Sequence, residues 1–289
     1  MKIKQLTGKV IIIGLLLFVA LSCDKQLDEP LDQQFVAEEI DYTETADMEL
    51  VLKGAYGQFY WLQWETFPVI GVRGDDVNAA GDQVPLWQIE EFRYDESAWI
   101  FNSIWLNLYG DIFTFSAAID EILKYQENLD NPAIADEYIA EVKVMKGFEM
   151  LQMVRIWGSI FIPETPLATE LYDLELSSPE KTLKYISDLM DEAIPLLPAV
   201  HPNERTDIPG GMTRYTALAV KALANLELKN WQEAANAAGE IINSGLFSLE
   251  TDYYNLFKTY GKLNDENILE LQYSDYGEGS GEMNYYLHA

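Results

Sequence analysis

The sequence is poor in the residues on which many enzymes and metal proteins depend. Its 289 residues include one cysteine and two histidines. A single cysteine excludes any disulfide within the chain. His201 stands in a proline-bearing loop and His288 is the penultimate residue, and we expect both to be solvated. A metal site or a histidine-based catalytic triad is therefore disfavoured.

Basic residues are also scarce. The chain has 19 Lys and Arg against 48 Asp and Glu, which gives a formal charge of −29. Phosphate binding needs clustered Lys and Arg, so nucleic acid is excluded as a partner. An anionic membrane surface would repel the chain for the same reason.

Motifs for cofactors and nucleophiles are missing. The sequence has no G-x-S-x-G, no phosphate-binding P-loop and no dinucleotide fingerprint. We therefore expect no cofactor, no metal and no enzyme activity. Carboxylates are plentiful, so a glycosidase pair stays an open alternative. Asp75-Asp76 and Glu90-Glu91 are the candidate pairs, and we expect them to be solvated, although Asp75-Asp76 could also stabilise a turn or bind calcium.

Long apolar runs are absent except for Val10 to Leu21. Twelve helical residues rise about 18 Å, less than the roughly 30 Å hydrocarbon core of a bilayer. Three lysines precede the run, which favours a signal peptide over 1–22. Cys23 would then be the first mature residue and a lipidation site, the alternative being an ordinary secretory signal with a chance cysteine. Removal of residues 1–22 leaves 16 basic and 48 acidic residues, a formal charge of −32. Residues 23–43 are polar and aperiodic, as in a lipidated tether.

The remaining residues, 44–289, are mainly of helical pattern. Met48, Leu52, Ala55, Tyr56 and Phe59 keep 3-and-4 spacing, and Thr45 is a candidate cap. Further helices are predicted from about residue 99, over 133–157, and from Ser177 or Ser178 to about Pro195. The stretch from Pro68 to Glu96 carries three glycines and two prolines and is predicted to be a long, functional loop.

Residues 213–229 and 231–245 predict an antiparallel helical hairpin, with Asn230 between the two helices and Gly245 as the stop. We expect the apolar face of the second helix to include Trp231, Ala234, Ala235, Ala238, Ile241 and Ile242. The size of the hairpin is typical of a tetratricopeptide repeat. Residues 98–129 and 134–157 predict a second hairpin. The expected fold is all-α, a tetratricopeptide-like scaffold with long loops and a short strand at 268–273.

Aromatic residues are abundant, with seven Trp and seventeen Tyr. A sugar ring needs a flat apolar platform and planar hydrogen-bonding groups beside it. The 68–96 loop carries both kinds of residue. Its candidate ligand-binding residues are Trp87, Tyr94, Arg73, Asn78, Asp82 and Gln83. The alternative is that Trp87 only anchors the loop. We expect the helically spaced Trp99, Trp105, Trp157 and Trp231 to lie in the core, while Trp61 and Trp64 are undecided.

Several segments together resemble the SusD/RagB family of surface glycan-binding lipoproteins. They include C-D-K-Q-L-D-E-P from Cys23, A-D-M-E-L-V-L-K-G-A-Y from Ala46, the Gly74-Asp75-Asp76 turn, and W-L-N-L-Y from Trp105. The most recognisable are Glu141 to Gly158 and Gly210 to Tyr273. Lys146, Gly147 and Phe161 depart from the family pattern, where Arg, Ala and Pro are usual.

The resemblance implies a lipid-anchored outer-membrane protein facing the cell surface. It implies capture of an oligosaccharide, without bond cleavage, and delivery to a SusC-like TonB-dependent transporter. It places part of the ligand site in loops after the small-Asp turn, which supports Trp87 as the platform. Asp76 is a further candidate ligand-binding residue. Family members are longer, so 44–289 is expected to be their N-terminal helical domain without most of the C-terminal half. A peptide ligand, a helical-repeat adaptor that binds only protein, and a glycan-cleaving enzyme remain alternatives.

Overall fold

A computed structural model describes residues 40–59, 69–81, 84–166 and 172–272. The chain divides into a unit of residues 1–42 and a unit of residues 43–289, and every helix described below belongs to the second. Cys23, Trp61, Trp64, Asp82, Gln83 and His288 lie outside the described residues. Within those residues, no helix is both long and apolar enough to cross a bilayer.

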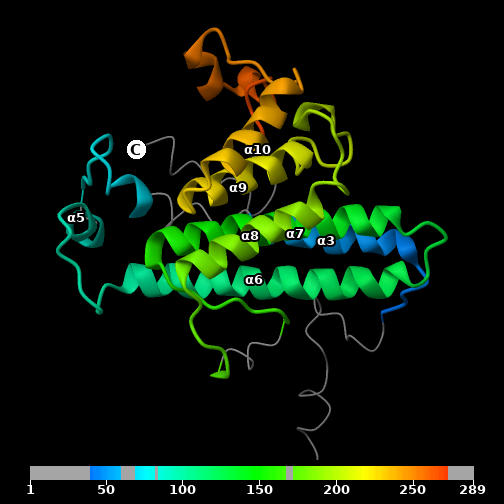
Figure 1. The fold of residues 1–289 in the computed structure, drawn as a ribbon, viewed down its shortest axis with the longest axis horizontal. Coiled ribbons are helices and arrows are strands. Elements are labelled where there is room, and N and C mark those ends of the chain that lie inside the picture. The colour runs from blue at the N-terminus through cyan, green and yellow to red at the C-terminus, as the bar shows by residue number, and fades with distance from the viewer. Residues whose placement is uncertain (1–39, 60–68, 82–83, 167–171, 273–289) are drawn as a thin grey trace, which may run out of the picture. The chain divides into compact units, whose positions relative to one another are not determined.

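The described residues form a stack of helices with long connections (Figure 1). The α-helices are α3 (Met48–Phe59), α5 (Val84–Glu90), α6 (Trp99–Gln126), α7 (Ala133–Trp157), α8 (Pro179–Ala193), α9 (Arg214–Glu227) and α10 (Trp231–Asn243). Short 3-10 helices are η2 (Thr45–Asp47), η5 (Pro202–Glu204), η6 (Tyr253–Phe257) and η7 (Thr259–Gly261). The mainly all-α fold predicted from the sequence is confirmed.

From α6 to α10, each helix packs against the next one in the chain, and α3 packs on α6 and α7. Residues 127–132 are a short connection between α6 and α7, and the two helices pack against each other. They therefore form the longer predicted hairpin. The start of α6 therefore lies beside the end of α7. This arrangement decides where the candidate site forms.

The buried face of α3 matches the sequence pattern residue for residue. Met48, Leu52, Ala55, Tyr56 and Phe59 are the buried residues of the helix. The α-helix begins at Met48 rather than at Thr45, because Thr45–Asp47 forms the tighter turn η2. Thr45 therefore does not cap α3. The apolar stripe alone is enough to place a single helix against a core.

The α9–α10 hairpin is confirmed, with a modified inner face. Thr213 caps α9 through a capping box with Thr216, and Gly245, with a left-handed φ of 70°, directly follows the C-cap of α10. Tyr215, Leu218, Ala237 and Ile241 form the buried cluster between the helices.

The outer face of α10 differs from the prediction. Trp231 and Ile242 are 61% and 74% exposed, and Ala235 is also exposed. Helix α10 packs against α9 and is the last α-helix of the stack, so its second apolar edge has no described helix to cover it. The expectation that Trp231 belongs to the core is wrong.

Two further predictions are corrected. The 68–96 loop contains a seven-residue helix, α5, whose Ile89 is buried. Residues 268–272 form no strand, and Tyr273 lies outside the described residues. Glu270 N–H donates to the Gly210 carbonyl at 3.0 Å, while the Ile268 carbonyl accepts from the Thr216 hydroxyl. The left-handed φ of 81° at Gly210 turns the partner chain away, so a ladder cannot continue.

Candidate functional site

A pocket of about 410 Å³ lies where the start of α6 meets the end of α7. Its volume falls within the roughly 300–1,000 Å³ typical of small-molecule sites. It is lined by Arg73, Tyr94, Asp95, Glu96, Ala98, Phe101, Asn102, Ile156 and Trp157. Three segments far apart in the sequence thus contribute to one cavity that combines aromatic rings with planar polar groups.

The segment before α6 is held by a compact turn. Asp95 Oδ1 accepts from the Ser97 N–H at 2.8 Å and from the Ser97 hydroxyl at 2.5 Å. The Ala98 N–H donates to the Asp95 carbonyl at 3.1 Å. The hydrogen bonds from Ser97 lower the pKa of Asp95, because they favour its carboxylate form. The turn therefore carries a fixed negative charge at the pocket.

Arg73 lies against two aromatic rings of the pocket. Its guanidinium carbon is 5.7 Å from the centre of the Tyr94 ring and 5.5 Å from that of Phe101. One terminal nitrogen donates to the Tyr94 hydroxyl at 3.3 Å. Its Nε is buried and has no hydrogen-bond partner among the described residues. Tyr94 and Phe101 are themselves in contact, with ring centres 4.9 Å apart. The guanidinium is thus held by cation–π contacts.

Trp157 is placed by the end of α7. It is the last helical residue, and Gly158 follows with a φ of 75° and donates its N–H to the Val154 carbonyl at 2.8 Å. The Trp157 ring meets the edge of Trp105, with ring centres 5.1 Å apart at 84°. Trp105 and Trp157 are both half-buried, whereas the sequence pattern predicted them to lie in the core. Trp99, six residues before Trp105 on α6, is 53% exposed, so the expectation that it lies in the core is wrong.

The residues predicted for ligand binding separate into two groups. Arg73 and Tyr94 line the pocket together. Trp87 is 48% exposed on α5, and neither Trp87, Asp76 nor Asn78 lines the pocket. Asp76 and Asn78 are exposed, as is Asp75, so the expected solvation of the first acidic pair is confirmed.

The second acidic pair is only partly solvated. Glu91 is exposed and pairs with Arg93. Glu90 is half-buried and accepts the Ala79 N–H at 2.8 Å, which ties α5 to the preceding loop. Glu90 therefore has a structural partner rather than a free carboxylate.

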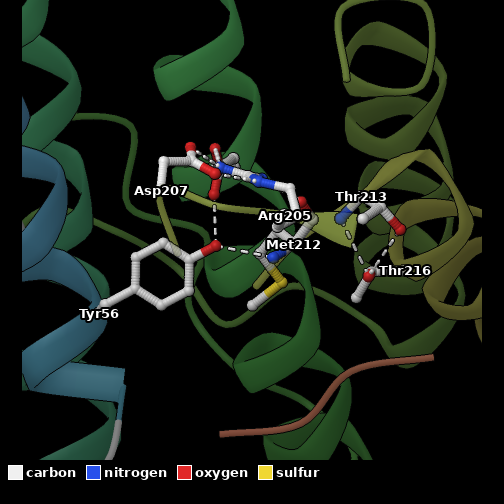
Figure 2. Close-up of polar contacts among 7 residues, drawn as sticks. Tyr56, Arg205, Asp207, Met212, Thr213 and Thr216 are labelled. Carbon is white, nitrogen blue, oxygen red and sulfur yellow. Dashed lines mark hydrogen bonds and ion pairs between the residues drawn. The ribbon is translucent and has the colours of Figure 1, made fainter. Parts of the chain in front are cut away.

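A second polar cluster, centred on the buried Arg205, lies away from the pocket (Figure 2). Arg205 donates to Glu141 at 2.9 Å and to Asp207 at 2.6 Å. The Tyr56 hydroxyl donates to Glu141 and accepts the Met212 N–H at 2.7 Å. Burial raises the pKa of Glu141 to about 7, against the opposite effect of Arg205. The hydrogen bond from Arg205 lowers the pKa of Asp207 to about 2. This cluster joins α3, α7 and the 205–212 loop, which is a structural role.

Glu149 on α7 is fully buried, and its two carboxylate oxygens have no hydrogen-bond partner among the described residues. Burial raises its pKa well above the ordinary value, and the nearby charge of Asp111 adds to the effect. Burial also raises the pKa of Asp111 to about 6, although Gln58 donates to it.

The expectation that His201 is solvated is wrong. Its side chain is only 3% exposed, and its ring centre lies 4.7 Å from that of Phe247. Its Nδ1 accepts the Asn203 N–H at 3.1 Å. This hydrogen bond makes His201 the N-cap of η5 and fixes the orientation of its ring.

The pocket suits binding better than hydrolysis. A glycosidase needs one carboxylic acid with a raised pKa, whereas the pKa of Asp95 is lowered. Among the described residues, no group of three or more His, Cys, Asp and Glu could hold a metal ion. Aromatic faces beside Arg73 and Asn102 are the chemistry that recognises sugar rings.

No protein-family model matches the chain. A SusD-like protein of Bacteroides ovatus is 24% identical over 279 residues, covering 91% of this chain and 49% of the relative. The crystal structure of a SusD superfamily protein from Bacteroides vulgatus superposes with a TM-score of 0.70 at 18% identity, over 80% of this chain and 50% of the other. The chain has the SusD-like fold.

The resemblance to the SusD/RagB family drawn from the sequence is thus confirmed. A further solved structure with a similar fold is the surface glycan-binding protein A from Bacteroides thetaiotaomicron, described in complex with laminarihexaose. It has a TM-score of 0.68 at 19% identity and is matched over 80% of this chain and 50% of its own. The chain spans about half the length of each of these three proteins.

Sequence reasoning missed most of the pocket. Asp95, Glu96, Phe101, Asn102 and Trp157 were not among its candidates, and Trp157 was expected in the core. One available signal was the run Tyr94 to Trp99, where two aromatics flank two acids directly before a long helix. The role of Trp157 had no local signal, because it depends on the α6–α7 reversal.

Proposed function

We propose that this SusD-like chain captures an oligosaccharide on the cell surface without cleaving it. The observation that carries the proposal is the pocket at the α6–α7 end, which combines Tyr94, Phe101 and Trp157 with Arg73 and Asn102. Apolar C–H faces of a sugar stack on such rings, and its hydroxyls pair with the polar groups. The similarly folded surface glycan-binding protein A, described in complex with laminarihexaose, supports the choice of ligand class.

The finer parts of the proposal concern location and partner. Cys23 is the lipidation site, 1–22 is the signal peptide and 23–43 is the tether. The lipid holds the protein to the outer membrane, facing the cell surface, and the captured glycan passes to a SusC-like TonB-dependent transporter. Support for these steps comes from the leader pattern and from the SusD/RagB resemblance.

The ligand-binding residues in this proposal are Arg73 and Tyr94 in the pocket, with Trp87 as a further platform on α5. Asp76, Asn78, Asp82 and Gln83 are proposed to contact a glycan that extends beyond the pocket. An exposed indole such as Trp87, 48% accessible, can stack on a sugar without rearrangement.

A glycan array with purified mature protein tests capture. We expect binding to at least one class of oligosaccharide, a loss of about tenfold or more in Tyr94→Ala, and a smaller loss in Trp87→Ala. Leu249→Ala is the control, because Leu249 is 81% exposed and outside the pocket. Absence of glycan binding, combined with retained pull-down of the transporter, would favour the protein-only adaptor. Peptide binding at the pocket would show that the ligand class is peptide rather than glycan.

Cleavage and anchoring need separate assays. Release of new reducing ends from a bound glycan would establish a glycoside hydrolase instead. Labelled palmitate should enter the wild-type chain and not Cys23→Ala, and the variant should wash off the cells. An unlabelled wild-type chain would contradict the proposed anchor.

A further inference from the structure

We propose that the pocket at the α6–α7 end selects neutral oligosaccharides over those that carry carboxylate or sulfate groups. This inference rests on the proposed glycan-binding function and specifies the class of glycan. It follows from the charges that line the pocket, from the contacts that occupy its one lining cation, and from the charge of the chain around it.

The lining charges are unbalanced toward the negative. Among the nine lining residues, Asp95 and Glu96 are acidic and Arg73 is basic. Asp95 is held as a carboxylate by the two hydrogen bonds from Ser97. A negatively charged sugar therefore meets two like charges for each opposite one.

The cation of the pocket is already engaged. The Arg73 guanidinium lies against the rings of Tyr94 and Phe101, and one of its terminal nitrogens donates to the Tyr94 hydroxyl. Bidentate recognition of a carboxylate or sulfate requires two parallel free donors. The Tyr94 hydroxyl already takes one terminal N–H of the guanidinium, which disfavours such a bidentate contact.

Other cations close in sequence to the lining residues are also paired. Arg93 forms an ion pair with Glu91, and Arg155 pairs with Glu227 at 2.9 Å. The chain as a whole carries 48 acidic and 19 basic residues. The long-range field therefore repels an approaching polyanion and adds to the local preference.

Matched ligands isolate the charge from the sugar scaffold. The array pairs neutral hexasaccharides of glucose, mannose and galactose with their C6-oxidised uronate forms. At about 20 mM ionic strength we expect each bound neutral sugar to bind about tenfold more tightly than its uronate partner. In about 0.5 M NaCl the ratio should fall toward twofold, because the charges are screened.

Charge-neutralising variants assign the effect to the pocket. Asp95→Asn combined with Glu96→Gln should raise uronate affinity relative to that of the matched neutral sugar and close most of the gap. Asparagine keeps the Oδ1 that accepts from Ser97, so the turn before α6 is retained. The control is Glu127→Gln combined with Asp130→Asn, two exposed acids near the opposite end of α6, roughly 35–40 Å away along the helix.

The outcomes separate this inference from the function on which it rests. Uronates that bind as tightly as, or more tightly than, their neutral partners would overturn the inference and leave glycan capture intact. The same holds if the control closes the gap as much as the pocket variant. Failure of every sugar to bind would overturn the proposed function itself, and the inference with it.

Discussion

Arg205 donates to the carboxylate of Glu141 at 2.9 Å, and the two side chains are 3% and 0% exposed. The pair joins the 205–212 loop to the middle of α7, 64 residues earlier in the chain. Tyr56 of α3 contacts the same carboxylate. Three distant segments thus meet at one buried charge pair. Replacing one partner of such a pair lowers stability more than replacing both partners.

Replacing Arg205 with Met should destabilise the protein by about 3–5 kcal/mol, because Glu141 is left buried without its cation. Adding Glu141→Met should recover a large part of that loss. Urea denaturation measures both changes in the free energy of unfolding. Arg93→Met is the matched control, because Arg93 pairs with Glu91 at the surface, and it should cost less than about 1 kcal/mol. Equal losses in the single and double variants would contradict the role of Arg205.

Glu149 should make stability depend on pH. Its pKa is raised in the folded state, so the folded protein binds more protons than the unfolded chain above the ordinary pKa of 4.5. The contribution is fully present below pH 4.5 and is lost as pH rises through the folded-state pKa. Asp111 acts in the same direction between its ordinary 3.8 and about 6.

Glu149→Met removes the buried carboxyl that lacks a partner in the described part of the chain. The variant should be more stable than the wild type at pH 8 by about 1–3 kcal/mol, and this advantage should shrink at pH 4.5. Denaturation at the two pH values measures the difference. An advantage that grows toward low pH would have the wrong sign and would refute this interpretation.

Gly210 and Gly245 should respond differently to alanine. Both have a left-handed φ, 81° and 70°. A Cβ on Gly210 would lie 2.2 Å from the Glu270 carbonyl oxygen, whereas one on Gly245 meets nothing within 4 Å. We expect a loss of about 1 kcal/mol in Gly245→Ala from backbone strain alone. Gly210→Ala should lose more and should expose residues 263–272 to limited proteolysis. Equal losses and equal cleavage would show that the close approach is unimportant.

Trp157 should be the stronger tryptophan for glycan binding and Trp231 should be neutral. Trp157 lines the pocket, whereas Trp231 is 61% exposed on α10 and does not line it. We expect Trp157→Ala to weaken binding about tenfold or more, since a stacking platform is lost, and Trp231→Ala to leave it unchanged. Isothermal titration of each variant with the best glycan gives the comparison. Loss in Trp231→Ala alone would place the site on α10.

The helices could be predicted where the whole apolar stripe is covered by neighbouring helices. The buried residues of α3 follow directly from their 3-and-4 spacing. The pattern failed on α10, because Trp231 and Ile242 extend its apolar stripe beyond the side that α9 covers. Spacing shows which residues share a face, and only the stack shows whether that face has a partner.

The pocket could be predicted only in part. Arg73 and Tyr94 were found because aromatic and planar polar residues are close in the sequence there. Trp157 joins them through a helix reversal that brings position 157 next to positions 101 and 102. The pairing of Glu141 with Arg205 likewise spans 64 residues and leaves no local pattern.

The bond between the Tyr56 hydroxyl and the Met212 N–H links positions 156 residues apart. During synthesis at about 5–20 residues per second, Tyr56 is therefore added roughly 8–30 s before Met212. Glu141 is added 64 residues before Arg205, so for roughly 3–13 s it has no Arg205 to pair with. The contact that ties α3 to the 205–212 loop can therefore close only after the chain has been made as far as Met212.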